Sequence, residues 1–229
     1  MTGKVISILG MHRSGTSCLS GMLENAGLNL GAVSRQNPHN IKGNNENQGI
    51  VALHEAVLAA NQSSWDAPPV AGCRWNPEHL EWLCGLLLDH YHLENWGFKD
   101  PRTLFTLEGW LEVAPGMKFI GTFRHPLAVA ASLMARGGGF AGRYLDLWYL
   151  YNRRLLRFQK LFGFDLVSFD DPPEVYVERV IEAAKNLGLN PVRSALTFFE
   201  DALRTHQGGE ITLSLQVEIL YRELLERAL

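Results

Sequence analysis

The stretch VISILGMHRSGTSCLSGML, residues 5–23, is the part of the chain that decides the fold. It begins with an apolar, β-branched run that predicts a buried strand, breaks at Gly10, and resumes from Thr16 with a helical pattern. A strand that turns at glycine into a helix directs backbone N–H groups and the positive end of the helix dipole at one point. This pattern is typical of a site for a phosphate-type anion. The alternative is a tight turn in which Gly and Ser serve geometry only.

The spacing of this turn, Gly10-x4-Gly15-Thr16-Ser17, is that of a P-loop with one departure. Nucleotide triphosphatases have a phosphate-reaching lysine where this chain has Thr16, and the nearest cation here is Arg13, inside the loop. We therefore expect the loop to bind a phosphate-type group without the usual ATP or GTP chemistry. The binding groups would be the Arg13 side chain and the backbone N–H groups of Ser14, Gly15, Thr16 and Ser17.

Strand and helix patterns alternate along the rest of the chain. Further strands are expected at residues 96–99, 118–123 and 164–168. Helices are expected at residues 16–26, 50–60, 77–91, 103–112, 127–136, 143–162, 173–187 and 192–204, with a last one ending near Leu229. The alternation predicts an α/β fold, a three-layer sandwich with a central parallel sheet covered on both faces. Ligands in such folds bind beyond the carboxyl ends of the strands, where Arg13, Lys99 and Arg124 are expected to lie.

Composition indicates one domain over residues 1–229, with 46% hydrophobic and 20% charged residues. The net charge of −3 argues against a nucleic-acid or membrane-surface binder, and no apolar run approaches the ~20 residues of a membrane span. Three cysteines without metal spacing, and no signal peptide, favour a cytoplasmic protein with free thiols and no bound metal. Residues 118–160 hold eight Lys/Arg against one acid, Asp146. That excess suits a polyanionic ligand, or else it is a solvated helix face.

Three further segments carry residue types suited to phosphate chemistry. In FRHPLAVAAS, residues 123–132, Arg124 leaves a strand and Ser132 follows eight positions later, so a guanidinium and a hydroxyl could share one phosphate. Taken alone, the pair would be read as a surface charge and a packing residue. GFKDPRT, residues 97–103, places Lys99 at a strand end. GNNENQGIVALHEAVL, residues 43–58, ends a polar loop and enters a helix.

Together with the RSGTS loop, these segments resemble the sulfotransferases that use 3′-phosphoadenosine 5′-phosphosulfate (PAPS), in the branch of bacterial and glycan-modifying enzymes. The resemblance implies a fold like that of the P-loop NTPases. It implies that Arg124 and Ser132 hold the 3′-phosphate of the donor, and that Lys99 faces the 5′-phosphosulfate. Cytosolic members have a histidine base where this chain has Pro101, so that role does not transfer.

The same resemblance makes Glu46 the candidate general base. A charge that stabilises the start of the next helix is the rival interpretation. His12, His54 and Glu55 are weaker candidates, and a solvated helix face is the favoured reading of His54 and Glu55. Asp100 and Arg102 are expected to form a structural ion pair.

The predicted activity is therefore transfer of a sulfuryl group from PAPS to an acceptor hydroxyl of a glycan or small molecule, giving PAP and a sulfate ester. An amine is the other possible acceptor. Arg13, Lys99 and Glu46 would act on the reacting groups. Two alternatives stay open: a P-loop kinase or ATPase with an altered loop, and an inactive module that binds PAP or another anion. Trp65, Trp75, Trp82 and Trp96 are either stacking surfaces for the acceptor or packing residues.

Overall fold

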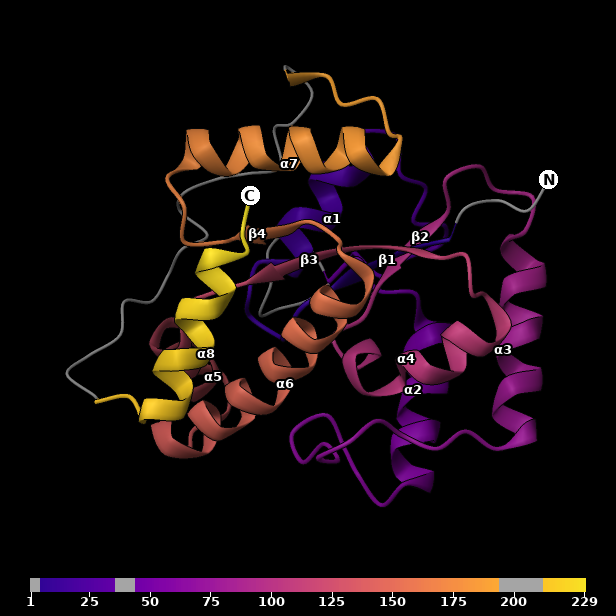
Figure 1. Ribbon diagram of the computed structural model, residues 1–229. Helices are drawn as coiled ribbons and strands as arrows, with labels where there is room; N and C mark the ends of the chain where they lie inside the picture. Colours follow the sequence, from indigo (N-terminus) through magenta and orange to yellow (C-terminus); the bar gives the residue numbers. More distant parts are fainter. Residues whose placement is uncertain (1–4, 36–43, 194–211) are drawn as a thin grey trace.

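The computed structural model describes residues 5–35, 44–193 and 212–229 as a four-stranded parallel sheet between two layers of helices (Figure 1). The strands are β1 Ile6–Leu9, β2 Gly97–Lys99, β3 Lys118–Phe123 and β4 Leu166–Ser168, in the order β2-β1-β3-β4. The helices are α1 Thr16–Asn25, α2 Gln48–Ala60, α3 Pro77–His90, α4 Thr103–Val113, α5 Pro126–Gly137, α6 Ala141–Phe162, α7 Pro173–Leu187 and α8 Leu215–Glu226.

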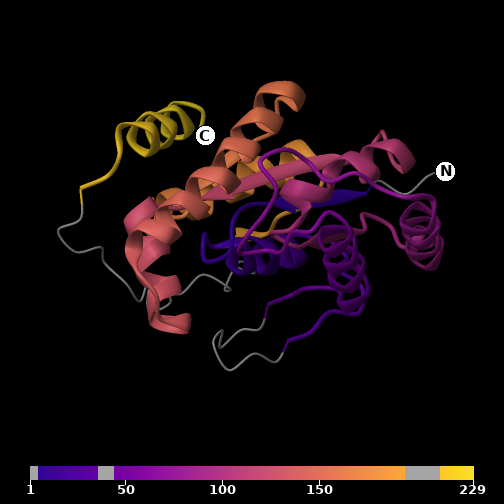
Figure 2. The same cartoon turned by 90° about the horizontal axis from the view of Figure 1, so that it is seen from below.

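Two apolar clusters, one on each face, hold the layers together. On one face, Ile6 and Ile8 of β1 pack with α1 and α7, which lie above the sheet in Figure 1. On the other face, side chains such as Phe98 and Phe123 pack with α2, α4, α6 and α8. Helices α3 and α8 lie at opposite ends of the molecule (Figures 1 and 2). The predicted α/β fold with a central parallel sheet covered on both faces is therefore confirmed.

Individual elements agree closely with the sequence patterns. Strand β3 and helix α7 begin and end at the predicted residues. Helix α2 begins two residues earlier than expected because Asn47 caps it, accepting hydrogen bonds from the backbone N–H groups of Gly49 and Ile50. The helix expected at 192–204, and much of the polar loop at 31–49, lie outside the described residues. No helix in the described ranges is both long and apolar enough to cross a membrane.

The parallel register brings the carboxyl ends of all four strands to one edge of the sheet. Ile8 pairs with Lys99, Leu9 with Gly121, and Phe123 with Ser168. The segments that follow the strands therefore start side by side, although the first and the last lie far apart in the chain. This edge is where ligands bind in open parallel sheets.

Candidate active site

The loop after β1 is shaped by two glycines that admit no side chain. A Cβ on Gly10 would lie 2.5 Å from the carbonyl oxygen of Thr122, and a Cβ on Gly15 would lie 2.3 Å from the ring of Phe169. Gly15 has a positive φ of 83° and begins α1 with no side-chain cap and no acid in the first turn. The positive end of the α1 dipole therefore faces this loop, and no acid of the helix's own first turn offsets it. Ser14 Oγ is buried here with no hydrogen-bond partner among the described residues.

Arg13 folds from this loop onto helix α5. Its backbone is left-handed, with a φ of 65°, a conformation that costs energy outside glycine. Its Nε donates to Oγ of the buried Ser132 at 2.7 Å. Burial, together with the charges of Arg136 and Arg124, lowers the pKa of the Arg13 guanidinium. Three arginines thus gather at the carboxyl edge of the sheet, which is an arrangement that attracts a polyanion.

Arg124 directly follows β3 and is buried, with only 6% of its surface exposed. Its guanidinium lies over the ring of Phe169, 5.3 Å from the centroid, and its Nε is 3.6 Å from Oδ1 of Asp170. Asp170 also accepts a hydrogen bond from the backbone N–H of His125 at 2.5 Å. The sequence analysis missed Phe169 and Asp170. Their position just after the fourth strand was the available signal, because that strand ends at the same edge.

Lys99 and Glu46 form a buried ion pair at the end of β2. Lys99 Nζ lies 2.6 Å from Glu46 Oε1, and 2% of the lysine side chain and 11% of the glutamate side chain are exposed. The carboxylate thus contacts a lysine at the sheet edge. The helix cap at this point is Asn47, and Glu46 lies directly before it, so a charge that stabilises the start of α2 stays a rival interpretation beside the ion pair with Lys99.

The three asparagines around Glu46 fix its place. The carbonyl oxygen of Asn44 accepts from Ser17 Oγ of α1, and Asn45 Nδ2 donates to Ser20 Oγ of α1 at 3.2 Å. Asn47 caps α2. The sequence NNEN therefore ties one carboxylate to α1 on one side and to α2 on the other, which places it beside Lys99.

Two of the weaker base candidates lie on opposite sides of α2. His54 is fully buried, so the expectation of a solvated helix face is wrong for this residue; it follows Ile50 by four positions and lies on the buried side of α2. Glu55, with 58% of its side chain exposed, is on the solvent side as expected and accepts from Arg102 Nη2 at 2.9 Å. The expected ion pair of Asp100 and Arg102 is present at 2.9 Å.

His12, within the loop, lies between aromatic rings. Its ring centroid is 4.9 Å from that of Trp65 and 5.9 Å from that of Tyr151, whose hydroxyl donates to the Trp65 carbonyl oxygen. Burial, and then the charge of Arg102, lower the pKa of His12 to about 3. A base this weak has little driving force to take a proton at neutral pH. Because its ring contacts that of His12, Trp65 is the tryptophan of the four that we place at the loop.

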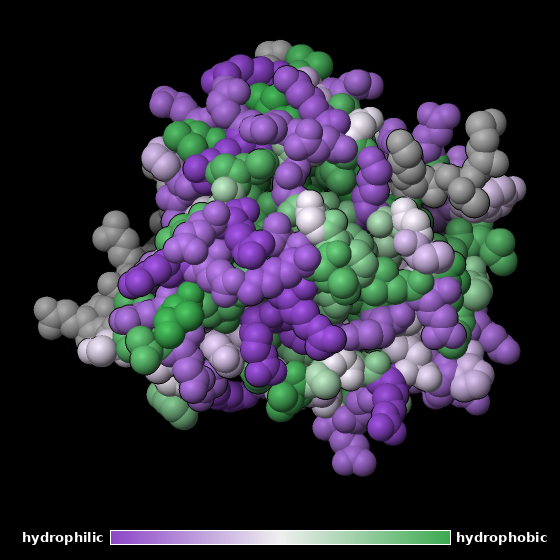
Figure 3. Space-filling model, in the orientation of Figure 1, coloured by the Kyte–Doolittle hydropathy of each residue, from purple (hydrophilic) through white to green (hydrophobic). Residues whose placement is uncertain are grey.

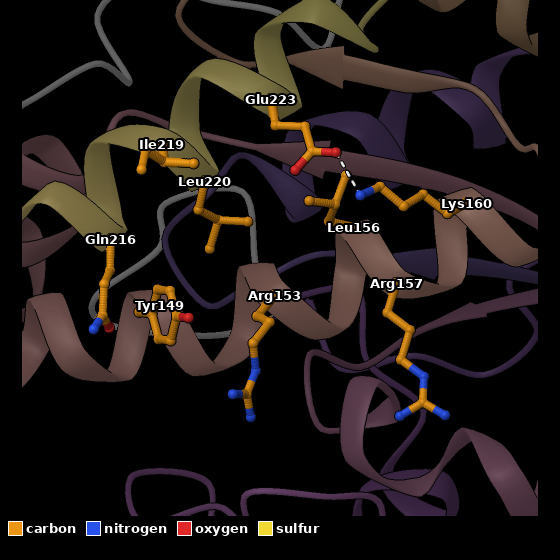
Figure 4. A pocket seen from close by; sticks show the side chains of 9 residues that line it. All are labelled: Tyr149, Arg153, Leu156, Arg157, Lys160, Gln216, Ile219, Leu220 and Glu223. Carbon is orange, nitrogen blue, oxygen red and sulfur yellow. Dashed lines mark ion pairs between the residues drawn. The ribbon is translucent and has the colours of Figure 1, made fainter.

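Some of the Lys and Arg side chains in residues 118–160 lie away from the candidate site. A hollow of about 500 Å³ lies between α6 and α8, and its lining includes Arg153, Arg157 and Lys160 but none of the candidate site residues (Figure 4). Lys160 meets Glu223 there, while Arg153 and Arg157 extend away from α8. Hydrophilic side chains gather over α6 in Figure 3, which has the orientation of Figure 1. The solvated-face reading therefore fits these later cations.

A family model described as the sulfotransferase family matches residues 6–164, which include β1, β2 and β3 and every site residue expected from the sequence. The chain belongs to the sulfotransferase family. No curated protein sequence matches this sulfotransferase significantly.

Solved structures with the same fold include the sulfotransferase domain of the Synechococcus PCC 7002 olefin synthase. It is 17% identical with a TM-score of 0.58, over 98% of this chain and 96% of that one. The sulfotransferase domain of the curacin biosynthetic pathway is 16% identical with a TM-score of 0.54, over 97% and 98%. A sulfotransferase from Alicyclobacillus acidocaldarius is 14% identical with a TM-score of 0.52, over 100% and 98%. At these identities the likeness concerns the fold.

Proposed function

We propose that this sulfotransferase moves a sulfuryl group from PAPS to an acceptor hydroxyl. The observation that carries the proposal is the Lys99–Glu46 ion pair, which joins a cation and a candidate base at the carboxyl edge of the sheet. Arg13, Ser132 and Arg124 supply cations and a hydroxyl at the same edge. A donor with a 3′-phosphate and a 5′-phosphosulfate needs such groups at two points.

The residues present fit an anionic donor. Ser14 Oγ is buried and, among the described residues, lacks a hydrogen-bond partner, and α1 begins without a side-chain cap. Backbone N–H groups of the loop, with Arg13, would bind the 5′ end of the donor. Arg124 and Ser132 would bind the 3′-phosphate, because a guanidinium forks onto phosphate oxygens and a hydroxyl adds a further bond.

In the reaction, the acceptor oxygen forms a bond to sulfur as the bond from sulfur to the 5′-phosphate oxygen breaks. Arg13 and Lys99 would stabilise the charge that grows on the departing phosphate. Glu46 would take the proton of the acceptor hydroxyl. Their pairing suggests an order of events: when Lys99 turns to the donor, the Glu46 carboxylate loses its partner and becomes available as a base.

The acceptor is proposed to be a carbohydrate or another small molecule. Trp65, half-buried beside His12, offers an aromatic ring next to the loop. By contrast, Trp96 is buried against His90 and Trp110, and so takes the packing role.

The proposal is tested by a screen of hydroxyl and amine acceptors with PAPS labelled in the sulfuryl group. Transfer of the label to an acceptor, with PAP formed in equal amount, supports it. A matched screen with ATP–Mg²⁺ as donor addresses the kinase alternative. Binding of PAP without transfer to any acceptor would instead favour an inactive binding module.

A further inference from the structure

A buried chain of hydrogen bonds lies directly beneath the Lys99–Glu46 pair. Oδ2 of Asp100 is 2.9 Å from Nδ1 of His54, and Nε2 of His54 is 2.8 Å from Nε1 of Trp110. The exposed fraction is 1% for Asp100 and 0% for His54 and Trp110. Buried polar groups linked in this way restrict each other to one arrangement.

The indole of Trp110 decides which nitrogen of His54 carries the proton. An indole N–H can only donate, so Nε2 of His54 must accept and therefore holds no proton. The ring proton then lies on Nδ1, where it is donated to Asp100 Oδ2. Hence His54 is neutral, in one tautomer, as long as the Trp110 bond stands.

The other oxygen of Asp100 is occupied by the turn itself. Oδ1 accepts from the backbone N–H of Arg102 at 3.0 Å and from its Nη1 at 2.9 Å. The second guanidinium nitrogen, Nη2, returns to α2 at Glu55. The turn that follows β2 is thus fixed to α2 at two places, His54 and Glu55.

The geometry shows two contacts between the same two segments. Lys99 and Asp100 are adjacent at the end of β2, and they contact Glu46 and His54, which belong to α2 and its lead-in. The inner contact, His54–Asp100, is completely buried, whereas Glu46 in the outer one is partly exposed. A shift of α2 against β2 would change both distances together.

We propose that His54 is a positioning residue: through Asp100 it holds the end of β2 against α2, so that Lys99 is aimed at Glu46 and at the donor. This inference rests on the function proposed above for Lys99 and Glu46. His54 touches neither reacting group, and its neutral ring moves no proton. Its role is to keep the two groups in register, and small displacements of such groups reduce rates strongly.

The test compares His54→Phe with His54→Asn, whose amide N–H can still donate to Asp100. The first readout is the rate at which Lys99 is acetylated by a trace amount of acetic anhydride in the ligand-free protein. The acetylated lysine is quantified by mass spectrometry. Lys118, which begins β3 and donates to the Leu187 carbonyl oxygen, is the internal control lysine. We expect Lys99 labelling to rise about tenfold in His54→Phe and much less in His54→Asn, with Lys118 unchanged. Unchanged Lys99 labelling, or an equal rise at both lysines, would overturn the proposal.

A second measurement is made on the wild-type chain, and a variant serves only to assign the signal. Proton–nitrogen correlation spectra of the imidazole rings should show His54 protonated at Nδ1 and without a proton at Nε2. The signal is assigned by its loss in His54→Asn. A proton on Nε2 would contradict the proposal.

The catalytic readout separates this inference from the proposed function. With an acceptor from the screen, His54→Phe should lower kcat by about 10- to 100-fold and leave KM for PAPS within about threefold. A change in KM for PAPS with an unchanged kcat would count against a positioning role for His54. Should the wild-type chain neither bind PAP nor transfer sulfate, the proposed function fails, whereas the labelling and tautomer results still decide the His54 contacts.

Discussion

Nε of Arg13 donates to Oγ of Ser132 at 2.7 Å, which joins the loop after β1 to helix α5 across 119 positions of sequence. The two segments are those expected to serve opposite ends of the donor, the 5′ and the 3′ phosphate groups. A contact between them means that neither end of the site is built independently of the other.

Replacing Ser132 by Ala should therefore affect both ends of the site. The hydroxyl that Arg13 uses is lost, and with it a proposed contact to the 3′-phosphate, at a cost of about 1–3 kcal/mol for a group left without its partner. PAP affinity measured by titration calorimetry should fall about 5- to 100-fold. Ser63→Ala, in the loop after α2, is the control and should bind PAP as the wild type does. Unchanged PAP affinity in Ser132→Ala would separate this hydroxyl from the donor site.

Arg124→Ala should discriminate between donors by their 3′-phosphate. Loss of a charge-assisted contact costs about 1.5–3 kcal/mol per bond, so PAP binding should weaken strongly. Adenosine 5′-phosphosulfate, which lacks the 3′-phosphate, should bind nearly as well as it does to the wild type. Arg143→Ala, half-exposed and paired with Asp66, is the control from the same basic run. Equal losses for both ligands would mean that Arg124 acts on folding or elsewhere in the site.

Glu46→Gln should reduce turnover while donor affinity stays nearly intact. Removal of a general base typically costs about 10²- to 10⁴-fold in rate. The amide still reaches Lys99, so the geometry of the pair is largely kept. Glu24→Gln, a surface carboxylate paired with Arg35, is the control and should leave turnover unchanged. If Glu46→Gln retains full turnover with an acceptor, the base is a different group and the assignment of Glu46 is wrong.

Asp100→Asn should lower stability in a pH-dependent manner. Burial alone would raise the pKa of this carboxyl, but the charge of Arg102 and the hydrogen bond from His54 hold it below its ordinary value of 3.8. A carboxylate with a lowered pKa stabilises the fold above the unfolded value, and that contribution is lost as the pH falls through the folded one. Removing one partner of a buried pair costs about 3–5 kcal/mol.

The difference in free energy of unfolding between wild type and Asp100→Asn is best measured with urea at pH 7 and again near pH 3. It should be at its full size at pH 7 and smaller at the acid pH. A difference of the same size at both values would show that the Asp100 charge contributes nothing to the fold.

The sequence predicted the sheet because its strands are short apolar runs that end at recognisable residues. Strand β3, for instance, ends where Arg124 begins, and α7 begins at Pro173. It also predicted the cations, since Lys99 ends a strand, Arg124 follows one directly and Arg13 lies in the glycine-flanked loop after β1. What it could not reveal were partners far apart in the chain: Asp100 lies 46 positions from His54, and no local pattern links them.

His54 itself left a local signal that the sequence analysis did not use. It lies four residues after Ile50 and four before Leu58, both buried, so the helical period places it on the apolar side of α2. A polar residue at such a position needs a buried partner. The interpretation as a solvated face followed from residue type instead of period.

The central claim, that the carboxyl edge of the sheet binds PAPS through cations and backbone amides, is tested most directly by titrating PAP into the protein in the presence of EDTA. The account predicts binding that EDTA leaves unchanged, since every proposed contact comes from Arg13, Arg124, Ser132, Lys99 or the loop backbone. ATP–Mg²⁺, titrated in parallel without EDTA, should bind much more weakly. Loss of PAP binding in EDTA with recovery on adding Mg²⁺, or tighter binding of ATP–Mg²⁺ than of PAP, would contradict the claim.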